Sequence, residues 1–494
     1  MNKVNPRTLS GFMELSPNDQ IEFNRIKKII EDTYKLYGFY PLDTPVIEYS
    51  EVLLAKAGGE TEKQIYRFNK GDNDLSLRFD LTVPLAKYVS LKYNELLFPF
   101  KRYQIGKVFR GERPQKGRFR EFYQCDIEVI GDGELSLMYD AEIPSIIYDI
   151  FTKMNIGKFV IRINNRKILN GFFEYLNLSD KYQDILRIID KMEKVSESDL
   201  IDMLKEIDLT DEIIDKILSF IKIKGTNGEI LNSLKGLNIS NEAFLNGINE
   251  LETVINSLRT MNINEEYFMI DLTIARGLDY YTGTVYETKL IDYPQMGSVC
   301  SGGRFDDLAS YYTDNKLPGV GISIGLTRLF YQLKENGLIK NESDSVVDVM
   351  ILPMVEEYKV PLEISKRLRD VGISTSICYT NKKFKSKIKY ADSMNVKYSI
   401  IIGEDEINNN VITIKDMNKN EQMQINVDEL EEYFKKCWHY ILGVLILVYR
   451  WFGGIGEVVN TPDCGSGMRG SDSHISPHLF VKSWRCKYDW NSLF

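Results

Sequence analysis

The segment from Phe109 to Gly131 constrains the fold of this chain most strongly, because two alternating stretches flank a turn there. Pro114 and Gly117 mark the turn, and apolar and polar residues alternate on either side of it. The pattern predicts two antiparallel strands, in which side chains of one parity share a face. That face would carry Arg110, Glu112, Gln124, Asp126 and Glu128. Because a solvated face does not need such mixed chemistry, the hairpin predicts a polar binding site.

Histidine and tryptophan are confined to the end of the chain, since all three histidines and all four tryptophans lie after Cys437. A Ser-His-Asp triad, a histidine-ligated zinc ion and a histidine general base are therefore excluded from the first 437 residues. The six cysteines form no CxxC pair, so we predict no metal site built from His or Cys and a reduced, cytoplasmic setting. Chemistry in this part of the chain must rely on Arg, Glu, Asp, Gln and Tyr.

The length of 494 residues predicts two to four domains rather than one core. A net charge of −9 argues against indiscriminate nucleic-acid binding, which depends on neutralising phosphates. Residues 101–120 nevertheless hold eight Lys or Arg and a single acid, which is a local basic patch. The N-terminus has no apolar signal region, and the apolar run 440–449 is too short to span a bilayer unaided, so no membrane association is expected.

Hydrophobic periodicity predicts the main helices and strands. A helix is expected over 18–36, ending at Gly38, and another is expected to begin near Gly325. Charged residues with helical spacing fill 166–262, where no chemical motif is present. Strands are expected at 75–80, 98–110, 121–130 and within 268–303.

These segments predict a domain organisation. After a polar linker at 334–345, strand and helix alternate in a way that predicts a parallel-rich α/β domain. Residues 437–494 break the pattern, and we interpret them as an atypical tail that is not native to the fold, the alternative being a fused functional element. The predicted units are an α+β domain over 1–165 and 263–333, an all-α insertion over 166–262, and an α/β domain over 346–436.

Six sequence blocks, which follow one another along the chain in the order of the family, resemble the motifs of class II aminoacyl-tRNA synthetases in the form found in the histidyl-tRNA synthetase family. The predicted hairpin resembles motif 2. YGFYPLDTPVIEYSEV at 37–52 resembles motif 1, and LRFDLTVPLAKYV at 77–89 resembles the family's amino-acid-binding strand. ARGLDYYTGTVYE at 275–287 resembles its histidine-recognition signature, CSGGRFDDL at 300–308 resembles the companion of that signature, and PGVGISIGLTRLF at 318–330 resembles motif 3.

The resemblance implies a class II antiparallel sheet flanked by helices, with 346–436 as a class IIa anticodon-binding domain. It implies ATP-dependent activation of L-histidine to histidyl-adenylate and transfer to the 3′ end of tRNA(His), with ATP and Mg²⁺ as cofactors. Motif 1 implies a homodimer. The insertion is either a helical scaffold segment or a domain that clamps the tRNA acceptor arm, and the resemblance favours the second.

Activation of an amino acid needs no general base, because the attacking carboxylate is already ionised. It needs neutralised charge and in-line placement, which arginines and Mg²⁺ supply. By resemblance, Arg276 bridges the substrate carboxylate and the phosphate and is catalytic together with Arg110. The implied ATP contacts are Arg110 on the α-phosphate, Arg328 on the γ-phosphate, Arg118 on a further phosphate, Glu112 at the adenine edge and Phe122 stacked on the ring.

Selectivity for histidine would follow from the donor and the acceptor on the imidazole ring. By resemblance, Glu128 and Tyr281 bind its two nitrogens and Tyr280 packs beside them, although core aromatics are the alternative for both tyrosines. The α-ammonium is assigned to Asp80, Thr82 and Gln124. At Asp80 the bacterial form of the family often has glutamate, so this chain keeps the charge with a shorter reach.

Contacts with RNA are expected at two places. At the tip of the predicted hairpin, Arg113 and Gln115 would touch the acceptor end of tRNA. In the α/β domain, a lysine run would bind RNA or form an ordinary solvated face; it comprises Lys382, Lys383, Lys385, Lys387 and Lys389.

Two other functions compete with the ligase. A regulatory subunit of ATP phosphoribosyltransferase shares the catalytic fold, but as a family it lacks the anticodon-binding domain and usually has a degraded ARGLDYY segment. A synthetase-like sensor of uncharged tRNA would need a kinase domain. Because both ligase features are intact in this sequence, it favours the ligase.

Overall fold

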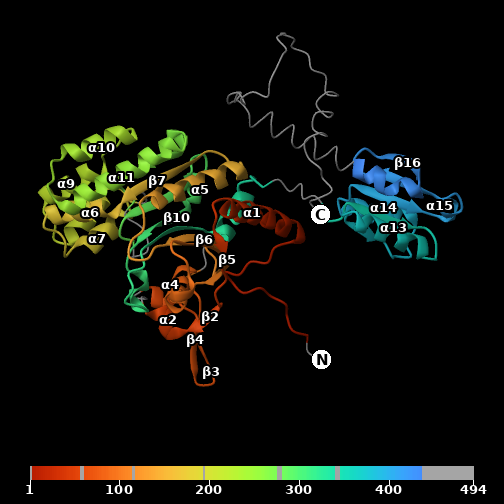
Figure 1. The fold of residues 1–494 in the computed structure, drawn as a ribbon, viewed down its shortest axis with the longest axis horizontal. Helices are drawn as coiled ribbons and strands as arrows, with labels where there is room; N and C mark the ends of the chain where they lie inside the picture. Colours follow the sequence, from red (N-terminus) through yellow and green to blue (C-terminus); the bar gives the residue numbers. More distant parts are fainter. Residues whose placement is uncertain are drawn as a thin grey trace, which may run out of the picture. The chain divides into compact units, whose positions relative to one another are not determined.

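The computed structural model describes residues 3–55, 60–113, 117–192, 195–274, 281–339 and 345–436. The chain divides into two compact units between residues 343 and 344. Figure 1 shows both units.

The first unit is built on an eight-stranded sheet that is antiparallel throughout its centre. Only the two edge strands run parallel to their neighbours. The order across the sheet is β1 (Tyr40–Pro41), β5 (Phe100–Phe109), β6 (Glu121–Ile130), β11 (Gly319–Ile324), β10 (Ser298–Phe305), β9 (Thr284–Leu290), β7 (Phe159–Asn165) and β8 (Phe268–Ile270). The predicted α+β fold with an antiparallel class II sheet is confirmed.

The two predicted strands of the central hairpin are confirmed, and in their register Val108 pairs with Phe122 and Arg102 with Glu128. One face of its strands is apolar and packs on α1 (Pro17–Leu36), α5 (Met138–Met154) and α12 (Leu326–Glu335). Helix α1 covers the predicted span, begins at a Ser16 N-cap and is followed by Gly38 at φ +76°. The other face of the hairpin is left for the polar residues.

A smaller three-stranded sheet orders as β2 (Ile47–Tyr49), β4 (Asn73–Leu77) and β3 (Arg67–Lys70), near α2 (Ser50–Leu54), α3 (Glu60–Gln64) and α4 (Thr82–Lys92). The strand predicted at 75–80 ends at Leu77, so the prediction is wrong for its last three residues. Thr82 is instead the first residue of α4, and the Asp80 carboxylate accepts backbone N–H groups there. A carboxylate at a helix N-terminus satisfies donors that the helix leaves open.

The described residues between 166 and 260 are mainly helical, as the charged pattern predicts. Several of its helices begin at side-chain caps, including capping boxes at Ser196 and Thr226. Figure 1 shows these helices gathered at one end of the first unit, in yellow to green. They are α6 (Arg166–Tyr175), α7 (Tyr182–Ile189), α8 (Glu197–Glu206), α9 (Asp211–Ile221), α10 (Asn227–Gly236) and α11 (Glu242–Thr260).

The second unit is a five-stranded sheet with helices, as the alternating pattern predicts. The strand order is β13 (Thr375–Ile377), β12 (Val349–Pro353), β14 (Tyr398–Ile402), β15 (Val411–Asp416) and β16 (Glu421–Asn426), with the first three parallel and the last two antiparallel. Its helices are α13 (Lys359–Asp370), α14 (Phe384–Ser393) and α15 (Glu404–Asn408).

Candidate active site

A cavity of about 400 Å³ opens on the polar face of the large sheet, bounded by β6, β10, β11 and the start of α12. Glu128 and Tyr281, which are far apart in sequence, both line it. Ten residues predicted for the site line this one cavity: Asp80, Thr82, Arg110, Glu112, Arg118, Phe122, Gln124, Glu128, Tyr281 and Arg328.

The acidic end of the cavity is centred on Glu128, which is buried on β6. Its carboxylate lies 2.9 Å from the Arg102 guanidinium and accepts a 3.0 Å hydrogen bond from the Thr82 hydroxyl. Burial raises the pKa of Glu128, whereas Arg102 and Thr82 oppose that rise by stabilising the charged form. Thr82 is therefore placed to orient Glu128, in addition to any contact with a ligand.

Asp80 and Asp126 add two further buried carboxyls to the same end. One oxygen of Asp80 accepts from the backbone N–H groups of Thr82 (3.1 Å) and Val83 (2.9 Å). Burial raises the pKa of Asp80 in spite of these donors. Burial, and then the charge of Glu128, raise the pKa of Asp126 to about 8. Three buried carboxyls thus lie together here, although Arg102 ion-pairs with Glu128 and not with Asp80 or Asp126, so the group is suited to a further cation.

Three arginines also line the cavity, and the charge of one of them, Arg110, acts on Asp80. The Arg110 guanidinium carbon lies 4.3 Å from the centre of the Phe79 ring and 5.1 Å from that of Phe122. Such stacking orients the guanidinium, and its Nε also donates to the Phe79 carbonyl at 3.2 Å. Arg328, in the first turn of α12, donates to the Met296 carbonyl at 2.9 Å while lining the cavity. Arg118 lies half exposed, 3.7 Å from the Glu112 carboxylate.

Other predicted residues lie elsewhere. Arg113 is exposed and does not line the cavity. Arg276, Tyr280 and Gln115 lie outside the described residues, as does the predicted tail 437–494.

The sequence reasoning missed two residues that support the site. Arg102 faces Glu128 directly across the β5–β6 ladder, and Ser323 on β11 accepts a 2.7 Å hydrogen bond from the Gln124 amide. Strand parity places Arg102 on the polar face of the hairpin, but its pairing with Glu128 depends on the register of β5 against β6. Two glycines also shape the pocket, because a Cβ at Gly321 would lie 2.6 Å from the Glu128 Cγ and one at Gly303 would lie 2.9 Å from the Tyr281 ring.

The sheet, the order of the motifs across it and this cavity define the catalytic unit of a class II aminoacyl-tRNA synthetase. The family model described as histidyl-tRNA synthetase matches residues 11–329, and the anticodon binding domain model matches 348–437. The chain belongs to the histidyl-tRNA synthetase family. Membership implies an ATP-using aminoacyl-tRNA ligase whose substrates are histidine and tRNA.

The chain matches similar proteins over nearly the whole length of those proteins. The chain is 54% identical to the histidine–tRNA ligase of Clostridium tetani over 88% of this chain and 99% of that protein. It is 47% identical to the ligase of Finegoldia magna over 87% of this chain and 100% of that protein. The crystal structure of histidyl-tRNA synthetase from a Nostoc species has 40% identity and a TM-score of 0.80, with 88% of this chain and 100% of that chain covered. The regulatory-subunit alternative is less supported. No helix within the described ranges is long and apolar enough to cross a membrane.

Proposed function

We propose that the cavity binds L-histidine at its acidic end and ATP at its arginine end, and joins them as histidyl-adenylate before transfer to tRNA(His). One observation carries the proposal: Glu128 and Tyr281 line the same cavity as Arg110 and Arg328. An amino acid and a polyphosphate would each meet groups of opposite charge within one enclosed space.

In the proposed reaction, the carboxylate oxygen of histidine forms a bond to the α-phosphorus of ATP as the bond to pyrophosphate breaks. Arg110 would neutralise the α-phosphate and Arg328 the γ-phosphate. Arg276 keeps its predicted role as the bridge between carboxylate and phosphate. Arg118, Glu112 and Phe122 keep theirs as ATP contacts.

Mg²⁺ would enter with the phosphates of ATP, which commonly supply several of its ligands. No group of three or more His, Cys, Asp or Glu within the described residues could hold a metal ion. The described side chains therefore do not fit a cage of their own for Mg²⁺, and we assign it no step.

Recognition of the imidazole ring would rest on Glu128 and Tyr281, with Tyr280 packing beside them. A side chain that lacks the donor or the acceptor would leave one of these buried groups unpaired, which opposes its binding. The α-ammonium would lie at Asp80, Thr82 and Gln124.

The test is histidine-dependent exchange of pyrophosphate into ATP, in the full chain and in Glu128→Gln. We expect exchange with histidine, and a KM for histidine raised about 10- to 100-fold in the variant because a charged acceptor is lost. A chain that binds histidine but never exchanges pyrophosphate would support the regulatory-subunit alternative instead.

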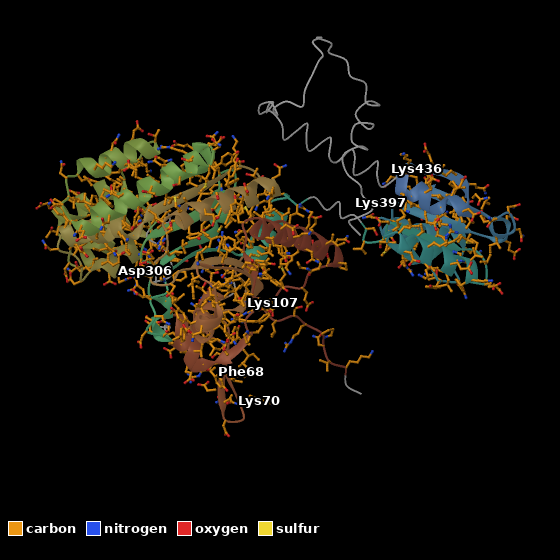
Figure 2. All side chains as sticks on the ribbon, in the orientation of Figure 1. Phe68, Lys70, Lys107, Asp306, Lys397 and Lys436 are labelled. Carbon is orange, nitrogen blue, oxygen red and sulfur yellow. The ribbon has the colours of Figure 1, made fainter. Side chains whose placement is uncertain are left out.

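We propose a homodimer formed through the motif 1 region. Several large apolar side chains are exposed there, including Tyr40 at 72% and Tyr49 at 54%. Phe68 is 38% exposed on the projecting β3–β4 hairpin, and Figure 2 shows it beside Lys70. Covering such a patch favours association. Sedimentation of Tyr49→Glu at a lower mass than the unaltered chain would support this assignment.

The remaining assignments concern tRNA and location. We propose that 166–262 clamps the acceptor arm, that Arg113 and Gln115 contact the acceptor end, and that 346–436 binds the anticodon. A cytoplasmic location is supported by three free, buried cysteines, Cys125, Cys300 and Cys378.

A further inference from the structure

Three buried acceptors among the residues that line the cavity have no hydrogen-bond donor: Oε1 of Gln124, Oδ1 of Asp126 and Oε2 of Glu128. Oε2 of Glu128 has an ion-pair partner in Arg102, 2.9 Å away, so Gln124 and Asp126 are the two left to explain. The amide nitrogen of Gln124 donates to Ser323 at 2.7 Å, which fixes the orientation of its amide. Asp126 is 1% exposed, so bulk water does not reach it freely. Buried acceptors without donors are uncommon in proteins, and here they point to a ligand that supplies the donors.

The geometry defines what kind of donor would fit. Gln124 and Asp126 are two residues apart on one face of β6, so their Cα atoms are about 7 Å apart. Asp80 uses one oxygen to hold the start of α4, and it lines the cavity beside them. A primary ammonium carries three donors and a positive charge, and can reach several acceptors at once. The acidic end therefore matches an ammonium better than a neutral amide or a hydroxyl.

The charges around Asp126 leave it in need of a cation. On β5, Arg102 contacts the Glu128 carboxylate, and in the segment before α4, Arg78 donates to the carbonyls of Thr44 and Lys107. Thus the nearby guanidinium groups are committed to other oxygens. The titratable groups whose charge acts on Asp126 or responds to it are Arg78, Arg102, Asp80, Glu128, Tyr34, Cys125 and Cys300.

We infer that Asp126 is a third acceptor for the α-ammonium of histidine, beside Asp80 and Gln124, and that it releases a proton when the substrate binds. This inference rests on the proposed histidine pocket and adds a residue to which that pocket assigned no role. In the step, the O–H bond of the Asp126 carboxyl breaks and the proton leaves to solvent. An N–H···O hydrogen bond from the ammonium then takes its place.

The direction of proton transfer follows from the ionisation of the free site. Burial and the neighbouring Glu128 carboxylate raise the pKa of Asp126, which favours the protonated carboxyl in the free site. An ammonium at hydrogen-bond distance favours the ionised carboxylate and lowers that pKa. Binding of histidine then becomes tighter as the pH rises from 7 toward the raised pKa of Asp126, by up to about tenfold per pH unit, until the α-ammonium of histidine itself loses its proton.

Two ligands separate this contact from the imidazole contacts. Imidazolepropionate keeps the ring and the carboxylate of histidine but lacks the α-ammonium. Calorimetric titrations at pH 7, in phosphate and in Tris, give the number of protons released with each ligand. We expect histidine to release close to one proton more than imidazolepropionate does. Equal release by the two ligands would overturn the inference, and this result requires no variant.

Asp126→Asn is the matching variant, because it keeps the shape and removes the charge. We expect this variant to abolish the release of the extra proton and to weaken the binding of histidine about 10- to 100-fold. The binding of imidazolepropionate should not change. Asp149→Asn makes the same chemical change on α5, where Asp149 accepts from the Tyr37 hydroxyl, and should alter neither ligand. Equal weakening of both ligands by Asp126→Asn would contradict an ammonium contact.

Glu128→Gln distinguishes this inference from the proposed pocket. If the pocket is right, this variant weakens both ligands, because both carry the ring. If Glu128→Gln weakens the binding of both ligands but Asp126→Asn affects the two ligands equally, the pocket stands and only the proposed role of Asp126 is wrong. If Glu128→Gln changes neither ligand, the imidazole pocket itself is wrong.

Discussion

The two sheets of this molecule bury different kinds of side chain. The large sheet encloses Arg102, Asp126, Glu128 and Arg304, each less than 9% exposed. In the second unit, β12 is apolar and buried at every position. Among the described residues 345–436, Lys387 is the buried charged side chain. Burying a charge opposes folding unless the charge is paired. The buried charges of the first sheet are therefore not explained by stability alone.

The buried pair Arg304–Asp140 tests the stability side of this comparison. Arg304 donates to the Asp140 carboxylate from both Nε and Nη2, and burial of Asp140 is nearly complete. Arg304→Met would leave a buried, unpaired carboxylate, so we expect a loss of about 3–5 kcal/mol in the free energy of unfolding of the first unit. Thermal unfolding followed by calorimetry would measure it.

The control is Arg367→Met in the second unit. Arg367 pairs with Glu431 at 2.5 Å, but the two side chains are 34% and 25% exposed. We expect that variant to cost about 0–1 kcal/mol. Similar losses for the two pairs would remove the distinction between the sheets.

Arg110 tests whether charge in the cavity serves chemistry rather than folding. Stacking on Phe79 and Phe122 holds the Arg110 guanidinium in place before the substrates bind. Because it would then stabilise charge in the transition state, Arg110→Ala should lower kcat for pyrophosphate exchange about 10²- to 10³-fold. The melting temperature should change little. Lys107→Ala is the control: Lys107 lies on β5 and pairs with Glu121 at 2.7 Å, outside the cavity lining. A comparable rate loss in Lys107→Ala would mean that general positive charge, not placement, matters.

Much of this site could be predicted from the sequence, since strand alternation is local. Parity alone placed Gln124, Asp126 and Glu128 on one face. The pairing of Arg102 with Glu128 was missed because it depends on how β5 aligns with β6, which the turn between them sets. Strand β7 was also missed, because this short strand is defined by its pairing with β9, more than 100 residues later in the sequence. The roles of individual residues came from resemblance, not from periodicity.

The five lysines of the run in the second unit were predicted to lie on one face, either binding RNA or exposed to solvent. In the structure, one of them is buried. Lys387 is 6% exposed and its ammonium donates to the Pro353 carbonyl, so its place in an RNA-binding face was predicted wrongly. The helical period turns this position toward the sheet. Lys382, Lys383 and Lys385 are exposed.

This separation predicts different responses to salt. Lys383→Ala and Lys385→Ala should each reduce the slope of log affinity for tRNA against log salt by about one, if each lysine neutralises a phosphate. Lys387→Met should leave the slope unchanged. Filter binding of tRNA at several salt concentrations would measure both. A reduced slope in Lys387→Met would mean that Lys387 leaves its buried position to reach RNA.

Removal of residues 437–494 should have the smallest effect on activity. It tests whether either unit needs that segment. The family models end by residue 437, and every histidine and tryptophan lies beyond it. We expect a chain ending at Lys436 to keep kcat/KM for aminoacylation within about twofold, because the proposed contacts to histidine, ATP and tRNA all precede that residue. The comparison needs the full chain and the shortened chain at equal folded concentration. A tenfold loss would make the segment part of the working enzyme, and a loss confined to the KM for tRNA would assign it to RNA binding.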